Sequence, residues 1–190
     1  KKIPFSKPDI RNEDINKVVK SLKSGWLTHG KYTKQLEGQF ENFTKAKYAT
    51  TVSNCTSGLH LACIAIGLKK GDEVIVPAQT HAATAHAAEL TGAKVVFAEV
   101  NQINGNILFS EKIKKINKKT KCVILVHMTG IPCDLSKIIK LCNKKKIRVI
   151  EDCAHALGTT FQKTHVGNFG ICGVFSVYPT KQITSGEGGV

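Results

Sequence analysis

The stretch CVILVHMTGIPCDLSKIIKLCNKKKIRVIEDCAHA, residues 122–156, decides the fold that the sequence predicts. Its first five residues are all apolar and predict a buried strand at 122–126. A helical pattern follows at 135–145, and a β-rich run at 148–150 leads into the acidic pair Glu151-Asp152. A strand, a helix and another strand in this order are typical of a parallel sheet that helices cover on both faces.

The same alternation continues along most of the chain. Two amphipathic helices are expected first, with apolar stripes at 15–22 and 32–43. Further strands are predicted at 49–53, 73–76, 94–97 and 173–177, and further helices at 57–67, 82–91 and 110–116. The helix at 57–67 is almost wholly apolar, so we expect it to be buried. The sequence therefore predicts a three-layer α/β/α domain with a mostly parallel sheet.

Polar or turn-forming residues follow several of these strands. Asn54, Pro77, His127 and Asp152 each lie at or just past a predicted strand end. A parallel sheet binds ligands at the carboxyl ends of its strands. We therefore expect these positions to converge on one edge of the sheet.

Lys181 stands between the apolar run 173–177 and the glycine-rich stretch 186–189. A lysine paired with a buried acid suits pyridoxal phosphate (PLP). The lysine amine binds the aldehyde as a Schiff base, and an acid such as Asp152 keeps the pyridine nitrogen protonated. The turn Asn54-Cys55-Thr56-Ser57 opens a helix, whose free amides and positive dipole end attract phosphate. These three features together predict a PLP site.

Six segments occur in an order that is similar to a known family. They are 24–28, 53–59, 77–81, 127–130, 151–158 and the Lys181 segment 175–189. Together they resemble the DegT/StrS-type sugar aminotransferases, PLP enzymes that aminate keto sugars carried on nucleotides. The resemblance extends over the whole chain and implies the aspartate aminotransferase-like fold of PLP enzymes, fold type I.

The resemblance also implies roles for single residues. Lys181 would be the catalytic residue, binding the cofactor and then moving a proton, and Asp152 would pair with the pyridinium nitrogen. Thr56, Ser57 and Ser176 would contact the phosphate. Most relatives have glycine at the position of Cys55, and this departure bears on the fine geometry of the phosphate loop.

Two histidines complete the implied cofactor site, His81 stacking on the pyridine ring and His155 reaching toward its phenolic oxygen. Three of the assignments have a structural alternative: a loop residue for His81, a buried histidine for His155, and a helix cap for Asp152. Thr56 and Ser57 fit both a helix cap and a phosphate contact, and one residue can do both. Trp26 lies in a loop that is near the active site in relatives, and it could contact substrate or pack in a core.

The formal net charge of +14 raises the question of nucleic-acid binding. Only Arg11 and Arg148 among the 28 basic residues are arginine, the better group for forked phosphate recognition. The lysines are spread along the chain with no basic stripe between aromatics. We therefore expect a lysine-rich surface and no nucleic-acid partner.

The remaining composition points to a cytoplasmic enzyme without a membrane span. No run of ~18 apolar residues is present, and the first residues lack a secretory signal. The seven cysteines form no C-x-x-C pair, so no metal site is expected, and reduced, largely buried thiols are predicted.

The predicted function is transfer of an amino group, from glutamate as donor, to a nucleotide-linked keto sugar in surface-glycan or amino-sugar biosynthesis. Alternatives are a PLP- or PMP-dependent sugar dehydratase of the same fold, in which histidine replaces the lysine, and an inactive regulatory or nucleic-acid-binding protein. We expect residues 1–190 to be the N-terminal segment and most of the PLP-binding large domain of a longer chain, with a small C-terminal domain absent. The complete chain is expected to be a homodimer. Residues 1–190 alone are expected to be inactive.

Overall fold

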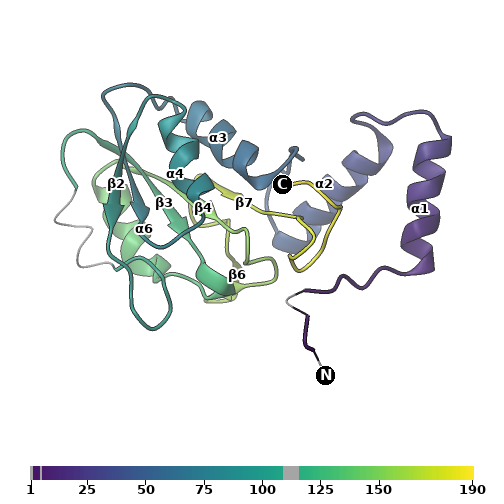
Figure 1. The fold of residues 1–190 in the computed structure, drawn as a ribbon. Coiled ribbons are helices and arrows are strands. Elements are labelled where there is room, and N and C mark those ends of the chain that lie inside the picture. Colours follow the sequence, from purple (N-terminus) through teal and green to yellow (C-terminus); the bar gives the residue numbers. More distant parts are fainter. Residues whose placement is uncertain (1, 5, 109–115) are drawn as a thin grey trace.

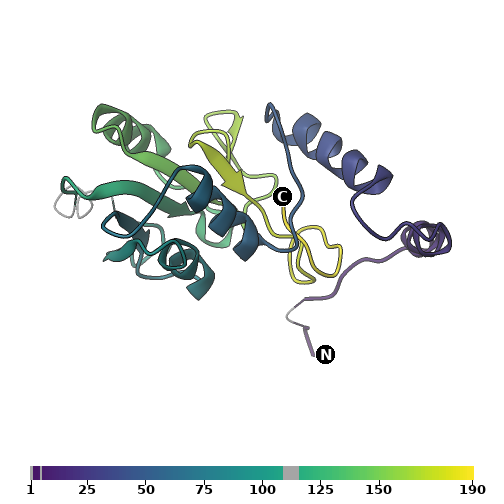
Figure 2. The same ribbon diagram turned by 90° about the horizontal axis from the view of Figure 1, so that it is seen from above.

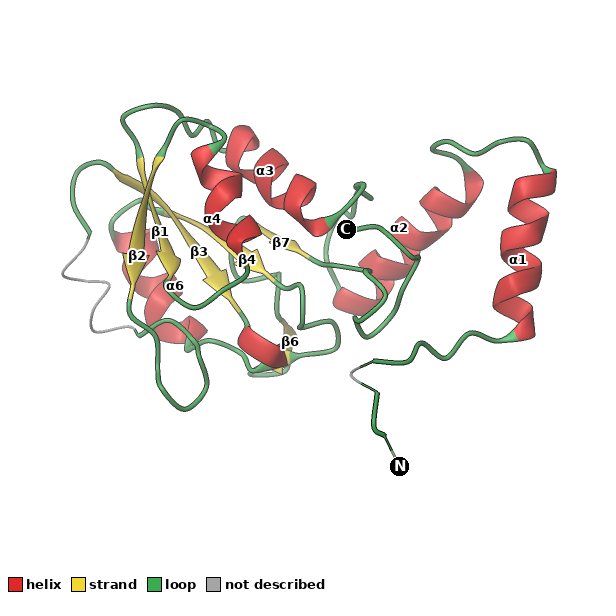
Figure 3. Cartoon of the chain, viewed as in Figure 1, coloured by secondary structure: helices red, strands yellow, loops and turns green. Residues whose placement is uncertain are grey.

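The computed structural model describes residues 2–4, 6–108 and 116–190. Its centre is a parallel sheet of five strands in the order β2-β1-β3-β4-β7. The strands are β1 (Glu73–Pro77), β2 (Lys94–Ala98), β3 (Thr120–Val126), β4 (Arg148–Asp152) and β7 (Cys172–Val174). A short antiparallel hairpin, β5 (Thr160–Phe161) and β6 (Thr164–His165), lies outside this sheet. The parallel sheet confirms the predicted α/β class (Figure 3).

Helices connect and cover the strands. They are α1 (Asn12–Lys23), α2 (Lys31–Thr44), α3 (Cys55–Ala65), α4 (Ala82–Glu89) and α6 (Leu135–Lys144), with a single 3-10 turn, η1 (Met128–Gly130), after β3. Helices α3 and α4 lie together on one side of the sheet and α6 lies on the other (Figures 1 and 2). The arrangement forms the three layers that the sequence predicts.

The core divides into two clusters because successive side chains of a strand point to opposite faces. In β3, Val123 and Leu125 join the cluster that contains α6, whereas Cys122 and Ile124 join the cluster under α3 and α4. Both faces of the central strands are thus buried, which explains why their sequences are continuous apolar runs.

The strand ends that matter for a site lie level with one another. Val126 of β3 pairs with Asp152 of β4, and Asp152 pairs with Val174 of β7. After β7 the chain loops out and returns, so that residues 188–190 run back beside 175–177. The backbone of Val190 exchanges two hydrogen bonds with Phe175, and Gly189 exchanges two with Val52. This return path brings the end of the chain beside the start of α3.

Three sequence predictions need correction, and a fourth falls almost entirely on residues that the structure does not describe. Residues 49–53 do not form a strand, because only Val52 pairs, in an isolated bridge to Gly189. The last strand ends at Val174, not at 177. Helix α3 is buried on one face only, and Leu61 on its outer face is 54% exposed, because a helix that lies on a sheet surface contacts it with one stripe. The helix predicted at 110–116 lies almost entirely outside the described residues.

Helix α1 stands away from the sheet at the far end of the molecule (Figures 1 and 2). Its apolar stripe is present as predicted, but within the described chain no residue of α1 is buried. None of the described helices is both long and apolar enough to cross a membrane. Of the seven cysteines, five are buried and two are half-buried, as predicted for largely buried thiols.

Candidate functional site

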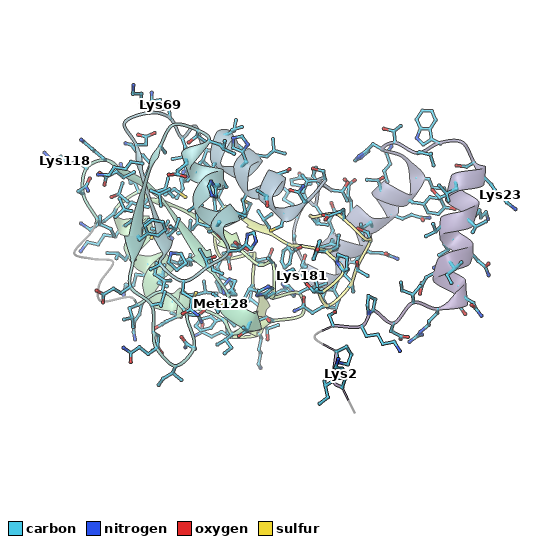
Figure 4. All side chains as sticks on the ribbon, in the orientation of Figure 1. Lys2, Lys23, Lys69, Lys118, Met128 and Lys181 are labelled. Carbon is cyan, nitrogen blue, oxygen red and sulfur yellow. The ribbon has the colours of Figure 1, made fainter. Side chains whose placement is uncertain are left out.

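A cavity of about 490 Å³ opens at the carboxyl ends of β3 and β4. Its walls come from the first turn of α3, the start of α4, the loop after β4 and the loop that carries Lys181 after β7. Met128 and Lys181, both labelled in Figure 4, line it from different segments. The cavity is therefore located where a parallel sheet binds ligands, and it collects most of the predicted site residues.

Asp152 ends β4 and forms part of the cavity wall, although only 5% of the residue is exposed. Its Oδ2 accepts a hydrogen bond of 2.8 Å from the Thr84 hydroxyl, and its Oδ1 accepts one of 3.1 Å from the Ala154 amide. Burial raises the pKa of Asp152, and these two hydrogen bonds oppose the rise. No helix begins after Asp152, so the helix-cap alternative is wrong.

Lys181 lies across the same cavity on the loop after β7, where its backbone amide donates to the carbonyl of Tyr178. Partial burial lowers the pKa of its ammonium, while the nearby Cys55 and Asp152 oppose this. The lysine is therefore easier to deprotonate than a surface lysine, as a nucleophile or base requires. The sequence placed Lys181 and Asp152 at one site, and the structure brings them to one cavity.

His155 also lines the cavity, but it is exposed, so the buried-histidine alternative is wrong. Burial of part of the ring and the charge of Lys181 lower the pKa of His155. The side-chain amide of Gln182 donates to the His155 carbonyl and ties the two loops together.

The start of α3 faces the cavity through Asn54, Cys55 and Thr56. Asn54 is the N-cap, since its Oδ1 accepts from the backbone amide of Ser57 at 2.8 Å. The prediction that Thr56 or Ser57 caps this helix is therefore wrong. Ser57 lies on the first turn but not in the cavity wall, and its hydroxyl accepts from Ser53 at 3.1 Å.

Ser176 is buried and lines the same cavity as the start of α3. Its bridge partner Gly189 packs closely against that helix. A Cβ on Gly189 would lie 2.8 Å from the Asn54 carbonyl carbon and 2.9 Å from the Phe175 oxygen. Only glycine permits this approach without moving backbone.

His81 lines the cavity as the N-cap of α4, and its Nδ1 accepts from the Ala83 amide at 3.2 Å. The ring is exposed and thus accessible to a ligand. Trp26 does not line this cavity. It is 64% exposed, so the core-packing alternative is wrong, and its indole nitrogen donates to the His29 carbonyl at 3.1 Å.

A buried hydrogen bond between a histidine and a carboxylate, which the sequence did not predict, lies at the cavity wall, where His127 is one of the lining residues. His127 Nε2 is 3.0 Å from Glu151 Oε2, and both side chains are 0% exposed. Because His127 Nδ1 accepts from the Cys133 amide at 3.2 Å, its proton is on Nε2 and is donated to Glu151. Three backbone amides, those of Gly167, Phe169 and Gly170, also donate to Glu151.

This network also explains a group of potential metal ligands. His127, Glu151 and Cys153 bring ligand atoms within 4.8 Å of one another. Both histidine nitrogens and both carboxylate oxygens are already hydrogen-bonded, and burial raises the pKa of the Cys153 thiol well above its usual range. The cluster is a closed hydrogen-bond network that holds the ends of β3 and β4 together.

The donor set of the cavity fits PLP on two structural grounds. The desolvated Asp152 carboxylate gains from a cationic partner on its cavity side, and a protonated pyridine nitrogen is such a partner. The N-terminus of α3 and Ser176 also line the cavity, and they offer donors suited to a phosphate. Lys181 supplies an amine within the same cavity. Thr80, Tyr178 and Glu187 also line the wall; they lie in segments that carry the family resemblance, but no role was predicted for them from the sequence.

Fold and cavity together define an α/β domain with a ligand cavity at the carboxyl edge of its sheet, into whose wall several titratable side chains are built. The chain belongs to the DegT/DnrJ/EryC1/StrS aminotransferase family, whose family model matches residues 8–190.

It is 42% identical over 189 residues to the GDP-perosamine synthase of Vibrio cholerae, covering 99% of this chain and 52% of that protein. The chain thus spans about half the length of this relative.

Two solved structures are similar throughout. One is an aminotransferase from Psychrobacter cryohalolentis, with a TM-score of 0.94 and 35% identity, covering 98% of this chain and 48% of the other. The second is an E. coli GDP-4-keto-6-deoxy-D-mannose-3-dehydratase with bound hydrated PLP, with a TM-score of 0.93 and 30% identity, covering 98% and 49%. The chain is thus similar both to an aminotransferase and to a dehydratase.

Proposed function

We propose that this protein is a PLP-dependent aminotransferase that moves an amino group from glutamate to a keto sugar linked to a nucleoside diphosphate. One observation carries the proposal: a half-buried lysine and a buried carboxylate from distant parts of the chain line one cavity. Residues 1–190 would supply the N-terminal segment and most of the cofactor-binding domain. Because the relative from Vibrio cholerae is a GDP-perosamine synthase, a GDP-linked sugar is the first substrate to test.

Lys181 and Asp152 divide the chemical work. PLP, when bound, supplies an electron sink for breaking the carbon–hydrogen bond next to the transferred nitrogen. The Lys181 amine holds the cofactor. It then takes up the proton that one carbon releases and delivers it to another carbon. Partial burial favours the neutral amine that both steps need. Asp152 holds a proton on the ring nitrogen, because a buried anion is stabilised by a cation beside it.

The remaining residues orient the cofactor. The amides at the start of α3, the Thr56 hydroxyl and the Ser176 hydroxyl would bind the phosphate. Ser57 would act through its place on the first turn, since its side chain is turned to Ser53. His81 would stack on the ring while its Nδ1 caps α4, and His155 would donate to the phenolic oxygen.

A dehydratase is the second candidate, favoured by the similarity to the dehydratase structure. Lysine at position 181 argues against it, because that branch has histidine in place of the lysine. An inactive protein is disfavoured because Lys181 and Asp152, the two groups to which the proposed chemistry is assigned, line one cavity.

The experiment is amino transfer by the complete protein of which residues 1–190 would be the N-terminal part, with residues 1–190 alone assayed beside it and expected to be inactive. The reaction contains PLP, glutamate and GDP-linked or other nucleotide-linked keto sugars, and it is read by mass spectrometry of the sugar and by release of 2-oxoglutarate. An aminated sugar together with 2-oxoglutarate supports the proposal. A sugar that has lost a hydroxyl group without gaining nitrogen identifies a dehydratase instead.

The matched control is a second lysine variant. Lys181→Ala should abolish product, whereas Lys69→Ala, on an exposed loop far from the cavity, should leave the rate unchanged (Figure 4). Product formation by Lys181→Ala at the wild-type rate would reject the proposed mechanism.

A further inference from the structure

Two threonine hydroxyls form a chain that leads to the Asp152 carboxylate. Thr84, on the first turn of α4, is 0% exposed, and its Oγ1 lies 2.8 Å from Asp152 Oδ2. Thr80 lines the cavity, and its Oγ1 lies 2.8 Å from Thr84 Oγ1. The chain thus runs from the cavity wall to the carboxylate through a hydroxyl that no solvent reaches.

The number of protons available determines which group donates and which accepts at each hydrogen bond between Thr80, Thr84 and Asp152. A hydroxyl has one proton to donate, and an ionised carboxylate only accepts. With Asp152 ionised, Thr84 donates to Oδ2 and therefore accepts from Thr80. The Ala154 amide, which can only donate, holds Oδ1. Both oxygens thus meet donors, and a proton on Oδ2 would force Thr84 and Thr80 to reverse.

We propose that Thr84 is a positioning residue for Asp152, with Thr80 completing the chain, so that the two hydroxyls orient the carboxylate and favour its ionised form. The inference rests on the proposed function, in which Asp152 pairs with the ring nitrogen of PLP. It deepens that function by naming residues that act through Asp152 without touching the cofactor's nitrogen.

Other titratable groups also face Asp152. They are His127 after β3, His155 and Cys153 after β4, Cys55 at the start of α3, and Lys181 after β7. Lys181, and the histidines when they are protonated, act on Asp152 through charge, and burial of Asp152 acts in the opposite direction. Thr84 is neutral at all pH values of interest, so removing its hydroxyl changes a hydrogen bond and leaves the charges of the site unchanged.

The test is a pH titration of the Asp152 carboxyl, by carbon-13 NMR of aspartate side chains, in the protein without PLP. Asp152→Asn assigns the resonance. In Thr84→Val, which keeps the shape and loses the hydroxyl, the proton affinity of Asp152 should rise about tenfold, equal to ~1.4 kcal/mol. Thr84→Ser should titrate as the wild type does.

Two outcomes would overturn the inference: an unchanged titration in Thr84→Val, or a serine variant that behaves like the valine variant. If Thr84→Val does not fold, Thr80→Val tests the same chain at a half-buried position, with a smaller rise in the same direction expected. An unchanged titration of Asp152 in a folded Thr80→Val would then reject the proposed role of the two hydroxyls.

A second measurement separates this inference from the proposed function. Thr84→Val should weaken PLP binding severalfold when Asp152 is present and leave it unchanged in an Asp152→Asn background, because the effect passes through that carboxylate. Equal weakening in both backgrounds would mean a merely structural role. If PLP does not bind at all but the Asp152 titration still shifts in Thr84→Val, the proposed function is rejected and the role of the two hydroxyls stands.

Discussion

Replacing Glu151 with glutamine should strongly destabilise the fold while preserving the shape of the side chain. The buried carboxylate accepts from His127 Nε2 at 3.0 Å and from the Gly167 amide at 2.9 Å through one oxygen. Its other oxygen accepts from the amides of Phe169 and Gly170 at 2.8 and 2.7 Å. A glutamine offers one oxygen, so in either orientation its NH₂ group faces two donors.

The magnitude follows from these contacts. Two hydrogen bonds to a charged group are lost, each worth roughly 1.5–3 kcal/mol, and two buried donors remain unsatisfied. Removing one charge from a fully buried network has a similar total effect on stability. We therefore expect the free energy of unfolding to fall by about 3–5 kcal/mol. That is a large part of the roughly 5–15 kcal/mol by which a domain is stable.

The assay is urea unfolding followed by circular dichroism, with Glu89→Gln as the matched control. Glu89 has an exposed side chain on α4 and pairs only with His86 at 3.6 Å among the ion pairs described, so its change should be within about 0.5 kcal/mol. If Glu151→Gln loses less than about 1 kcal/mol, the network does not hold the loop 167–170 as the structure implies.

Further predictions concern the helix start, the acid and the pH response. Asn54→Ala removes the acceptor of the Ser57 amide and should cost about 1 kcal/mol in thermal unfolding, whereas Asn54→Asp should cost much less. Asp152→Asn should slow amino transfer far more than it weakens PLP binding, measured as rate and dissociation constant; a near wild-type rate would make Asp152 structural. Burial alone would raise the pKa of Glu151, but its hydrogen bonds hold it below the ordinary 4.5. Its stabilisation is therefore present above pH 4.5 and is lost as pH falls through the folded value, so acid titrations of stability should be flatter in Glu151→Gln.

The sequence predicted the central strands well because they are apolar on both faces. Residues 122–126 and 148–150 face helices on each side, so their composition alone distinguishes them from loops. The strand at 49–53 was predicted wrongly for the converse reason. Its composition suits a strand, but a strand needs a partner, and only Val52 meets one, in a part of the chain more than a hundred residues away.

The site was predictable where chain position alone determines it. Asp152 and Lys181 could be placed at one edge because parallel strands end on the same side. The contact between Thr84 and Asp152 could not be predicted, since it depends on how α4 packs against β4 across 68 positions of sequence. The pair of His127 and Glu151 escaped prediction for the same reason, because only the register of β3 with β4 brings their side chains together.

Covalent labelling tests the central claim most directly. The protein is incubated with PLP, reduced with borohydride to fix any lysine-bound cofactor, digested, and mapped by mass spectrometry, with Lys69→Ala and Lys181→Ala treated in parallel. The account predicts one dominant label on Lys181, retained in Lys69→Ala and absent from Lys181→Ala. A dominant label on any other lysine, or equal labelling of the Lys181→Ala protein, would contradict it.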